Sequence, residues 1–248
     1  MQTGRSIVRA TIRRRRFSAA VKAFCAAVLL VLVGALLPDP AQSLERADAC
    51  MAIGLDVSGS ISSDEMQLQF RGLARALNHP RFIRAVSSGR HGLTAVTVFT
   101  WTSGRDVRVV VPWSGIGSAK DADHVAASLF ALPVGEGEGN TSLEVAVRTG
   151  TRLLTSCPWY AERQLLNIAG DGVTNVYPGP DEARDDANAV GIVINGLVID
   201  SEEFAALAHY ENSVVGPPGI GFVVTIRDYR DFHRGMLRKL LLEMAWAG

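Results

Sequence analysis

Hydroxyl and carboxyl side chains after an apolar segment could form a site for a hard metal ion. Asp56 lies near the end of the apolar run 50–57, and Ser58 and Ser60 follow it at alternate positions, with Gly59 allowing a tight turn. Alternation directs the three side chains the same way as the strand ends. Carboxylate and hydroxyl oxygens suit Mg²⁺, Mn²⁺ or Ca²⁺ rather than zinc. A helix-capping turn alone would explain one hydroxyl but not three spaced groups.

Two further segments carry the same kind of ligand. Thr141 follows a glycine-rich stretch, residues 135–140, and Asp171 comes after the apolar residues 165–169 and Gly170. In open α/β sheets, ligands bind outside the carboxyl ends of the strands. We therefore expect Thr141 and Asp171 to reach the edge of the sheet that carries Asp56.

The elements that must position these residues alternate between strand and helix. Periodicity, capping residues and turn residues indicate both kinds. Alternation over about 200 residues predicts an α/β fold, a mostly parallel sheet with helices on both faces. The predicted strands cover residues 50–57, 93–101, 106–112, 164–169, 191–199 and 222–226, and the helices 62–78, 118–132, 141–156, 181–189, 202–210 and 229–247.

The N-terminal 43 residues have the order of an export signal. Residues 1–22 are basic, residues 23–37 are apolar, and a small-residue run follows at 41–43. A membrane span needs about 20 apolar residues, which is more than this run offers. We expect a cleaved signal at 1–43, a single domain at 44–248, and a periplasmic or secreted protein. A retained membrane anchor is the alternative, and the Sec and twin-arginine export routes both stay open.

The zero net charge combines two unlike segments. The chain has 25 basic and 25 acidic residues, but residues 1–43 contain seven basic residues and one acidic residue. The remaining 18 basic and 24 acidic residues give a net charge of −6. Such a charge disfavours nucleic acid and offers no basic patch for anionic lipid. We expect membrane contact only if the signal is retained.

Two cysteines remain outside the predicted signal. Cys25 lies within it, whereas Cys50 and Cys157 belong to the predicted domain. In an oxidising compartment two cysteines suggest one disulfide, and two buried free thiols are the alternative.

The site residues resemble a known motif. Asp56, Ser58, Ser60, Thr141 and Asp171 occupy, in order, all five positions of the metal-ion-dependent adhesion site (MIDAS) of von Willebrand factor type A domains. The resemblance extends over about residues 50–246. Three segments, 111–113 (VPW), 171–175 (DGVTN) and 191–197 (GIVINGL), resemble an exported bacterial branch of that superfamily, the domain of unknown function 1194.

The resemblance implies a doubly wound six-stranded sheet of order 3-2-1-4-5-6, with strand 3 antiparallel at the edge. It implies one Mg²⁺, or Mn²⁺ or Ca²⁺, held by those five residues. The open coordination position would take an Asp or Glu side chain of a protein partner. In that strand order the strands after Cys50 and Cys157 are parallel neighbours, so the resemblance also implies a Cys50–Cys157 disulfide.

Other residues around the motif could contact the partner or support a different function. Glu136, Glu138, Asn175 and Tyr177 would form a partner-binding rim. A Mg²⁺-dependent phosphatase-like hydrolase is one alternative, but position 58 is Ser where such enzymes need a second carboxylate. A metal-free structural module is the other. A nucleotide site is disfavoured because two glutamates separate the loop glycines and no Lys-Ser or Lys-Thr pair follows. We therefore expect a binding module and not an enzyme.

Overall fold

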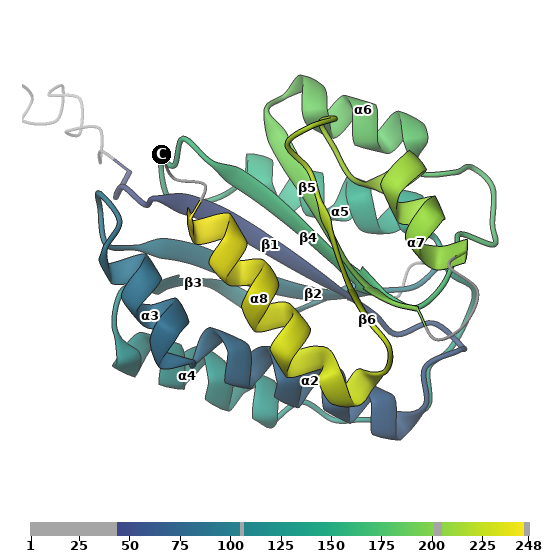
Figure 1. Cartoon of the computed structure of the whole chain (residues 1–248), viewed down its shortest axis with the longest axis horizontal. Helices are drawn as coiled ribbons and strands as arrows, with labels where there is room; N and C mark the ends of the chain where they lie inside the picture. Colours follow the sequence, from purple (N-terminus) through teal and green to yellow (C-terminus); the bar gives the residue numbers. More distant parts are fainter. Residues whose placement is uncertain (1–43, 105–106, 201–204, 246–248) are drawn as a thin grey trace, which may run out of the picture. The chain divides into compact units, whose positions relative to one another are not determined.

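Six strands form one sheet in the part of the chain that this computed structural model describes, residues 44–104, 107–200 and 205–245 (Figure 1). The order is β3-β2-β1-β4-β5-β6, and neighbours are parallel except β2 and β3. This confirms the expected order with an antiparallel edge strand. The predicted signal lies outside the described residues. The strands are β1 (Ala49–Asp56), β2 (Thr94–Trp101), β3 (Arg108–Ile116), β4 (Gln164–Gly170), β5 (Ile192–Ile199) and β6 (Val223–Ile226).

Helices cover both faces of the sheet, as the alternating pattern predicts (Figure 1). Side chains of β1 alternate between the faces: Met51, Ile53 and Leu55 join one apolar core, and Cys50 and Ala52 join the other. The first core lies under α2 (Ser63–Leu77), α3 (Pro80–Ser87), α4 (Ala119–Phe130) and α8 (Phe232–Ala245), and the second under α5 (Leu143–Thr155), α6 (Asp181–Ala189) and α7 (Ala205–His209).

Helix α3 is absent from the elements predicted above, because Pro80 reads as the end of the preceding helix. In the structure Pro80 begins a new helix. His79 caps it, its Nδ1 accepting from Arg81 N at 3.1 Å. Proline is favoured at the first helical position, because an N–H at that position would have no hydrogen-bond partner within the helix.

Strand β3 is longer than predicted and runs to Ile116 through Pro112. An edge strand tolerates a proline that cannot donate to a ladder, and the pairing of β2 with β3 shifts register between Val96 and Phe99. Residues Tyr210–Val214 form a π-helix, and Tyr229–Asp231 form a 3₁₀ turn before α8.

A disulfide joins Cys50 to Cys157, which confirms the pairing implied by the resemblance. Cys50 lies at the start of β1, and Cys157 follows the end of α5. The bridge therefore fastens α5 to the sheet at the end opposite Asp56. Residues Leu44–Gly248 form one unit by their internal contacts. Among the described residues, no helix has the length and apolar composition that a membrane crossing requires.

A buried ion pair within α8 is hydrogen-bonded to the sheet. Lys239 Nζ donates to Glu243 Oε1 at 2.7 Å, and both side chains are almost fully buried. Asn195 of β5 donates to the same oxygen at 2.8 Å and accepts from Phe222 N at 3.1 Å. Burial lowers the pKa of Lys239, and the charge of Glu243 partly opposes that shift. Each charge is therefore tolerated only with the other.

We expect Glu243→Gln to reduce the free energy of unfolding by about 3–5 kcal/mol, because it leaves the Lys239 ammonium buried without a counter-charge. The double variant Lys239→Met/Glu243→Gln removes both charges and should lose less than Glu243→Gln alone. Urea unfolding of Glu243→Gln, Lys239→Met and the double variant measures the coupling energy between the two side chains. Additive losses would mean that the two buried charges do not stabilise each other.

Candidate metal centre

The ends of β1 and β4 bring two carboxylates to one edge of the sheet. Asp56 is the last residue of β1, and Asp171 directly follows β4. These strands are parallel neighbours, with Leu55 opposite Ala169. Parallel strands end at the same edge, so both side chains belong to it. This is the edge that the sequence predicts.

The three hydroxyls are hydrogen-bonded around these carboxylates. Ser60 Oγ donates to Asp171 Oδ1 at 3.1 Å. Thr141 Oγ1 donates to Ser58 Oγ at 3.0 Å, and the backbone N–H of Ser58 donates to Asp56 Oδ1 at 2.8 Å. Asp56, Ser58 and Thr141 are buried, Asp171 is half-buried and Ser60 is exposed. The structure therefore brings together all five residues of the motif, with Ser60 on the solvent side.

The glycine-rich loop lies directly against the loop that follows β1. Gly59 N donates to Gly139 O at 3.0 Å, and Glu138 N donates to Val57 O at 3.1 Å. A Cβ on Gly137 would lie 1.9 Å from Ser58 O, so no side chain fits there. The glycines thus allow two backbones to touch, and this contact supports Thr141 beside Ser58.

Thr141 is also fixed from the loop after β4. Its N–H donates to Asn175 Oδ1 at 2.9 Å, and its carbonyl accepts from Asn175 N at 3.0 Å. Thr174 Oγ1 accepts from Leu143 N at 3.2 Å and donates to Thr141 O at 3.2 Å. Asn175 therefore has a positioning role in addition to the rim role expected from the sequence.

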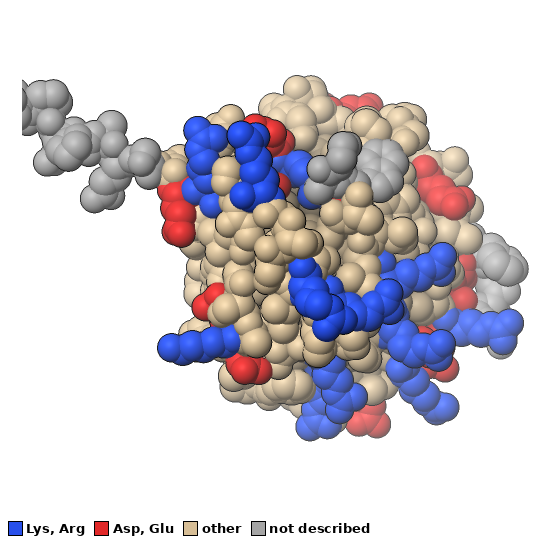
Figure 2. Space-filling view, turned by 60° about the vertical axis from the view of Figure 1, so that its left-hand side comes forward, with Lys and Arg blue, Asp and Glu red and all other residues tan. Residues whose placement is uncertain are grey.

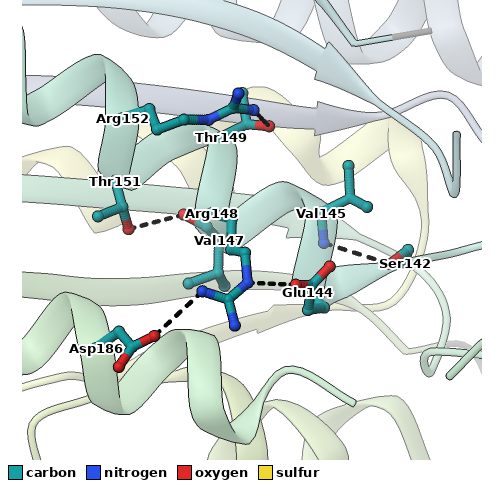
Figure 3. Close-up of polar contacts among 9 residues, drawn as sticks. All are labelled: Ser142, Glu144, Val145, Val147, Arg148, Thr149, Thr151, Arg152 and Asp186. Carbon is teal, nitrogen blue, oxygen red and sulfur yellow. Dashed lines mark hydrogen bonds and ion pairs between the residues drawn. The ribbon is translucent and has the colours of Figure 1, made fainter. Parts of the chain in front are cut away.

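Helix α5 begins at Leu143, two residues after Thr141. Its first turns are anchored by side chains (Figure 3). Ser142 caps it, accepting from Val145 N at 3.3 Å. Arg148 forms ion pairs with Glu144 on α5 and, at 3.1 Å, with Asp186 on α6. These contacts fix the helix start, and with it the position of the Thr141 hydroxyl.

One carboxylate oxygen of the site is buried without a partner. Asp56 Oδ2 has no hydrogen-bond partner in the described structure. Burial raises the pKa of Asp56 to about 7; hydrogen bonds from Ser58 oppose that shift, and the nearby Asp171 charge adds to it. Burial also raises the pKa of Asp171, with the Ser60 hydrogen bond acting against it. A cation between the two carboxylates would compensate both the burial and the repulsion.

Two buried tyrosines flank the carboxylates from opposite faces of the sheet. Tyr210 belongs to the core under α5, α6 and α7, and Tyr229 to the core under α2 and α8. Burial and the charges of Asp56 and Asp171 raise the pKa of both phenols. The Tyr210 hydroxyl has no hydrogen-bond partner in the described structure. The sequence did not predict that either tyrosine lies beside the carboxylates, because each belongs to a segment that the sequence predicts as helix.

The donor set fits a hard divalent cation. Two carboxylates and three hydroxyls supply oxygen only, and the orphaned Asp56 oxygen is the kind of group that a metal would satisfy. The described residues contain no group of three or more His, Cys, Asp and Glu side chains with metal-site geometry. A cation here would therefore depend on hydroxyl ligands, and the metal-binding role of the five residues stays a prediction.

The other predicted rim residues lie at the borders of this edge. Glu136 and Glu138 are exposed and line a groove of about 400 Å³ together with Val57 and Arg108. The Tyr177 side chain is 97% exposed. Their position leaves them accessible, and their contact with a partner stays a prediction.

Comparison with known proteins relates the chain to one family and one fold. The family model described as "Protein of unknown function (DUF1194)" matches residues 46–247. No curated protein sequence matches the chain.

Three solved structures illustrate the similarity of fold. Proximal thread matrix protein 1 from the mussel byssus, with a zinc-occupied MIDAS motif, is 16% identical with a TM-score of 0.59, over 82% of this chain and 48% of that one. The von Willebrand factor type A protein from Catenulispora acidiphila is 16% identical with a TM-score of 0.55, over 80% and 43%. The vWF domain of the type V pili tip protein Mfa5 from Porphyromonas gingivalis is 7% identical with a TM-score of 0.59, over 82% and 97%. This chain spans about half the length of the mussel proteins that it matches.

We expect Gly170→Ala to destabilise the protein by about 1–3 kcal/mol, the usual cost of overpacking. A Cβ at this position would lie 2.8 Å from the Tyr210 hydroxyl and 2.9 Å from Asp56 Oδ2. Gly172→Ala is the matched control, because its Cβ would meet nothing closer than 3.9 Å. Thermal unfolding compares the two variants, and equal stability would contradict the close packing of Tyr210 and Asp56 around Gly170.

Proposed function

The chain belongs to the DUF1194 family and has the fold of von Willebrand factor type A domains, and we propose that it is an exported, metal-dependent protein-binding module. The observation that carries this proposal is the buried, unpartnered Oδ2 of Asp56 beside a second carboxylate and three hydroxyls. Similar structures include a thread protein with a zinc-occupied MIDAS motif and a pilus tip protein.

The residues that would hold the cation are Asp56, Ser58, Ser60, Thr141 and Asp171. Mg²⁺ is the expected ion, with Mn²⁺ and Ca²⁺ as the other hard candidates. When bound, the ion would supply an electrophilic position for an oxygen ligand. Two carboxylates balance only its two charges, so the cation would still attract another carboxylate.

The partner is proposed to be a protein that presents an Asp or Glu side chain. Ser60 is exposed and Asp171 half-buried, so a partner would reach the site from the solvent side of these two residues. Glu136, Glu138, Asn175 and Tyr177 border this approach and would select among acidic partners. The glutamates would repel a partner whose other charges are negative.

Export is proposed from the predicted signal at 1–43, with a single binding domain at 44–248. The Cys50–Cys157 disulfide supports this proposal, because disulfides persist in oxidising compartments. The similar structures include a pilus adhesin and a pilus tip protein. A periplasmic or secreted location follows.

Binding is favoured over catalysis by the composition of the site. Ser58 stands where a phosphatase-like hydrolase would need a second carboxylate, and a hydroxyl is a poor general base. A hydrolase of this kind would also use a lysine at the site. The described lysines lie elsewhere: Lys239 is buried against Glu243 at the far end of the sheet, and Lys120 lies on α4. No second function is favoured by a specific contact.

We expect Mg²⁺ at 100 times its Kd to stabilise the protein by about 2.7 kcal/mol, because the ion would bind the folded state alone. For a chain of this size the Tm should rise by roughly 5–10 °C. Asp171→Asn should abolish this rise while the protein stays folded. Melting curves with Mg²⁺ and with EDTA provide the measurement.

Glu182→Gln is the matched control, since it also removes one carboxylate but lies exposed on α6. It should retain the full Mg²⁺ effect. Recovery of a partner from periplasmic extract should require both Mg²⁺ and Asp171. If Mg²⁺ changes neither melting nor recovery, the chain is a metal-free structural module and the proposal fails.

A further inference from the structure

Helices α3 and α8 carry a group of arginines on the surface of the molecule. Arg81 and Arg84 of α3 and Arg234 and Arg238 of α8 are all exposed. Helix α3 contains no acidic residue, and the single one in α8, Glu243, is buried against Lys239. In Figure 2 basic side chains extend across the middle and lower right of the face, with few acidic ones between them.

These arginines are largely without counter-charges. Among the described residues Arg234 pairs with Asp231 at 3.5 Å, and no ion pair forms at the other three. Two arginines on the opposite face of the sheet differ. Arg148 contacts both Glu144 and Asp186 (Figure 3), and Arg184 contacts two aspartates of α6. Arg81, Arg84 and Arg238 therefore present positive charge on α3 and α8 without an ion-pair partner among the described residues.

Between the two helices lies a groove of about 380 Å³ in which arginines surround leucines. Leu242 is 41% exposed and adds apolar surface to this groove. The α3·α8 contact places Arg81 beside the groove from the other helix. The lining residues are Arg81, Arg234, Leu237, Arg238, Leu241 and Leu242.

We propose that this groove binds an acidic, amphipathic segment of a partner protein. Arginine forms paired hydrogen bonds with carboxylates, which gives the rim a preference for Asp and Glu. The leucines between the arginines suit apolar side chains on the same segment, as in helix-in-groove recognition. A flat bilayer would meet the arginine tips and leave the leucine floor uncovered, so the groove favours a polypeptide.

The groove and the candidate metal centre belong to different parts of the fold. The metal centre lies at the carboxyl ends of β1 and β4, whereas the groove lies on the outer surface of α3 and α8. None of the groove residues contributes to the five-residue motif. Because the two sets of residues do not overlap, we expect the groove to bind its ligand without the metal.

Fluorescence anisotropy of a labelled peptide tests this proposal with the purified full chain. The peptide has about four helical turns, with Leu and Glu at i, i+3 and i+4 spacing. We expect binding that weakens with salt, since surface charges are screened. Arg238→Glu should weaken it at least about tenfold, because it places a like charge beside the peptide. Leu242→Ser should weaken it without changing the salt dependence.

Arg152→Glu provides the matched control, because Arg152 is exposed on α5 and its substitution makes the same change in charge on the other face. It should leave binding unchanged, and so should EDTA, which separates this proposal from the metal centre. Equal binding of a peptide with Lys in place of Glu would overturn the proposal. So would an equal loss with Arg152→Glu, or Arg238-dependent binding of anionic phospholipid vesicles without binding of the peptide.

Discussion

The burial of Asp56 is the constraint on which the arrangement of this molecule depends. A buried carboxylate with one unpartnered oxygen is unstable in isolation, and the pKa of about 7 reflects that cost. The surrounding contacts all act to hold it: the Ser58 N–H donates to its Oδ1, and Gln69 Nε2 donates to its carbonyl at 2.9 Å. The proposed cation would relieve this arrangement, because the polar groups of three connecting segments converge on this edge.

The strand order makes that convergence possible. With β1 and β4 as central neighbours, a residue at the end of each strand reaches the same edge without any long loop. Gly170 leaves room for Asp56 Oδ2 and the Tyr210 hydroxyl, and Gly137 lets the glycine-rich loop touch Ser58. The disulfide and the Lys239–Glu243 pair act at the opposite end of the sheet.

Much of this fold could be predicted from the sequence, because strands and helices alternate with clear caps and turns. The predicted strand ends are sufficient to place Asp56 and Asp171 at one edge of the sheet. Helix α3 could not be predicted, since Pro80 serves equally to end one helix or begin another. Tyr210 and Tyr229 give no local signal either, because only the sheet brings them beside the carboxylates. The role of the five motif residues as metal ligands was predicted from the resemblance and stays a prediction.

Net charge was the least informative of the sequence features, because it averages over faces that the fold separates. A value of −6 for residues 44–248 would repel an acidic partner from a distance. At an ionic strength of about 0.1 M, however, exposed charges interact only within about 10 Å. A partner's carboxylate at the α3–α8 groove therefore experiences Arg81 and Arg238 rather than the distant aspartates of α6. The same reasoning would apply at the candidate metal centre, where a bound divalent ion would act on a partner carboxylate at contact distance. On the two proposals made above, an acidic protein would recognise acidic ligands at two places because each place presents positive charge locally.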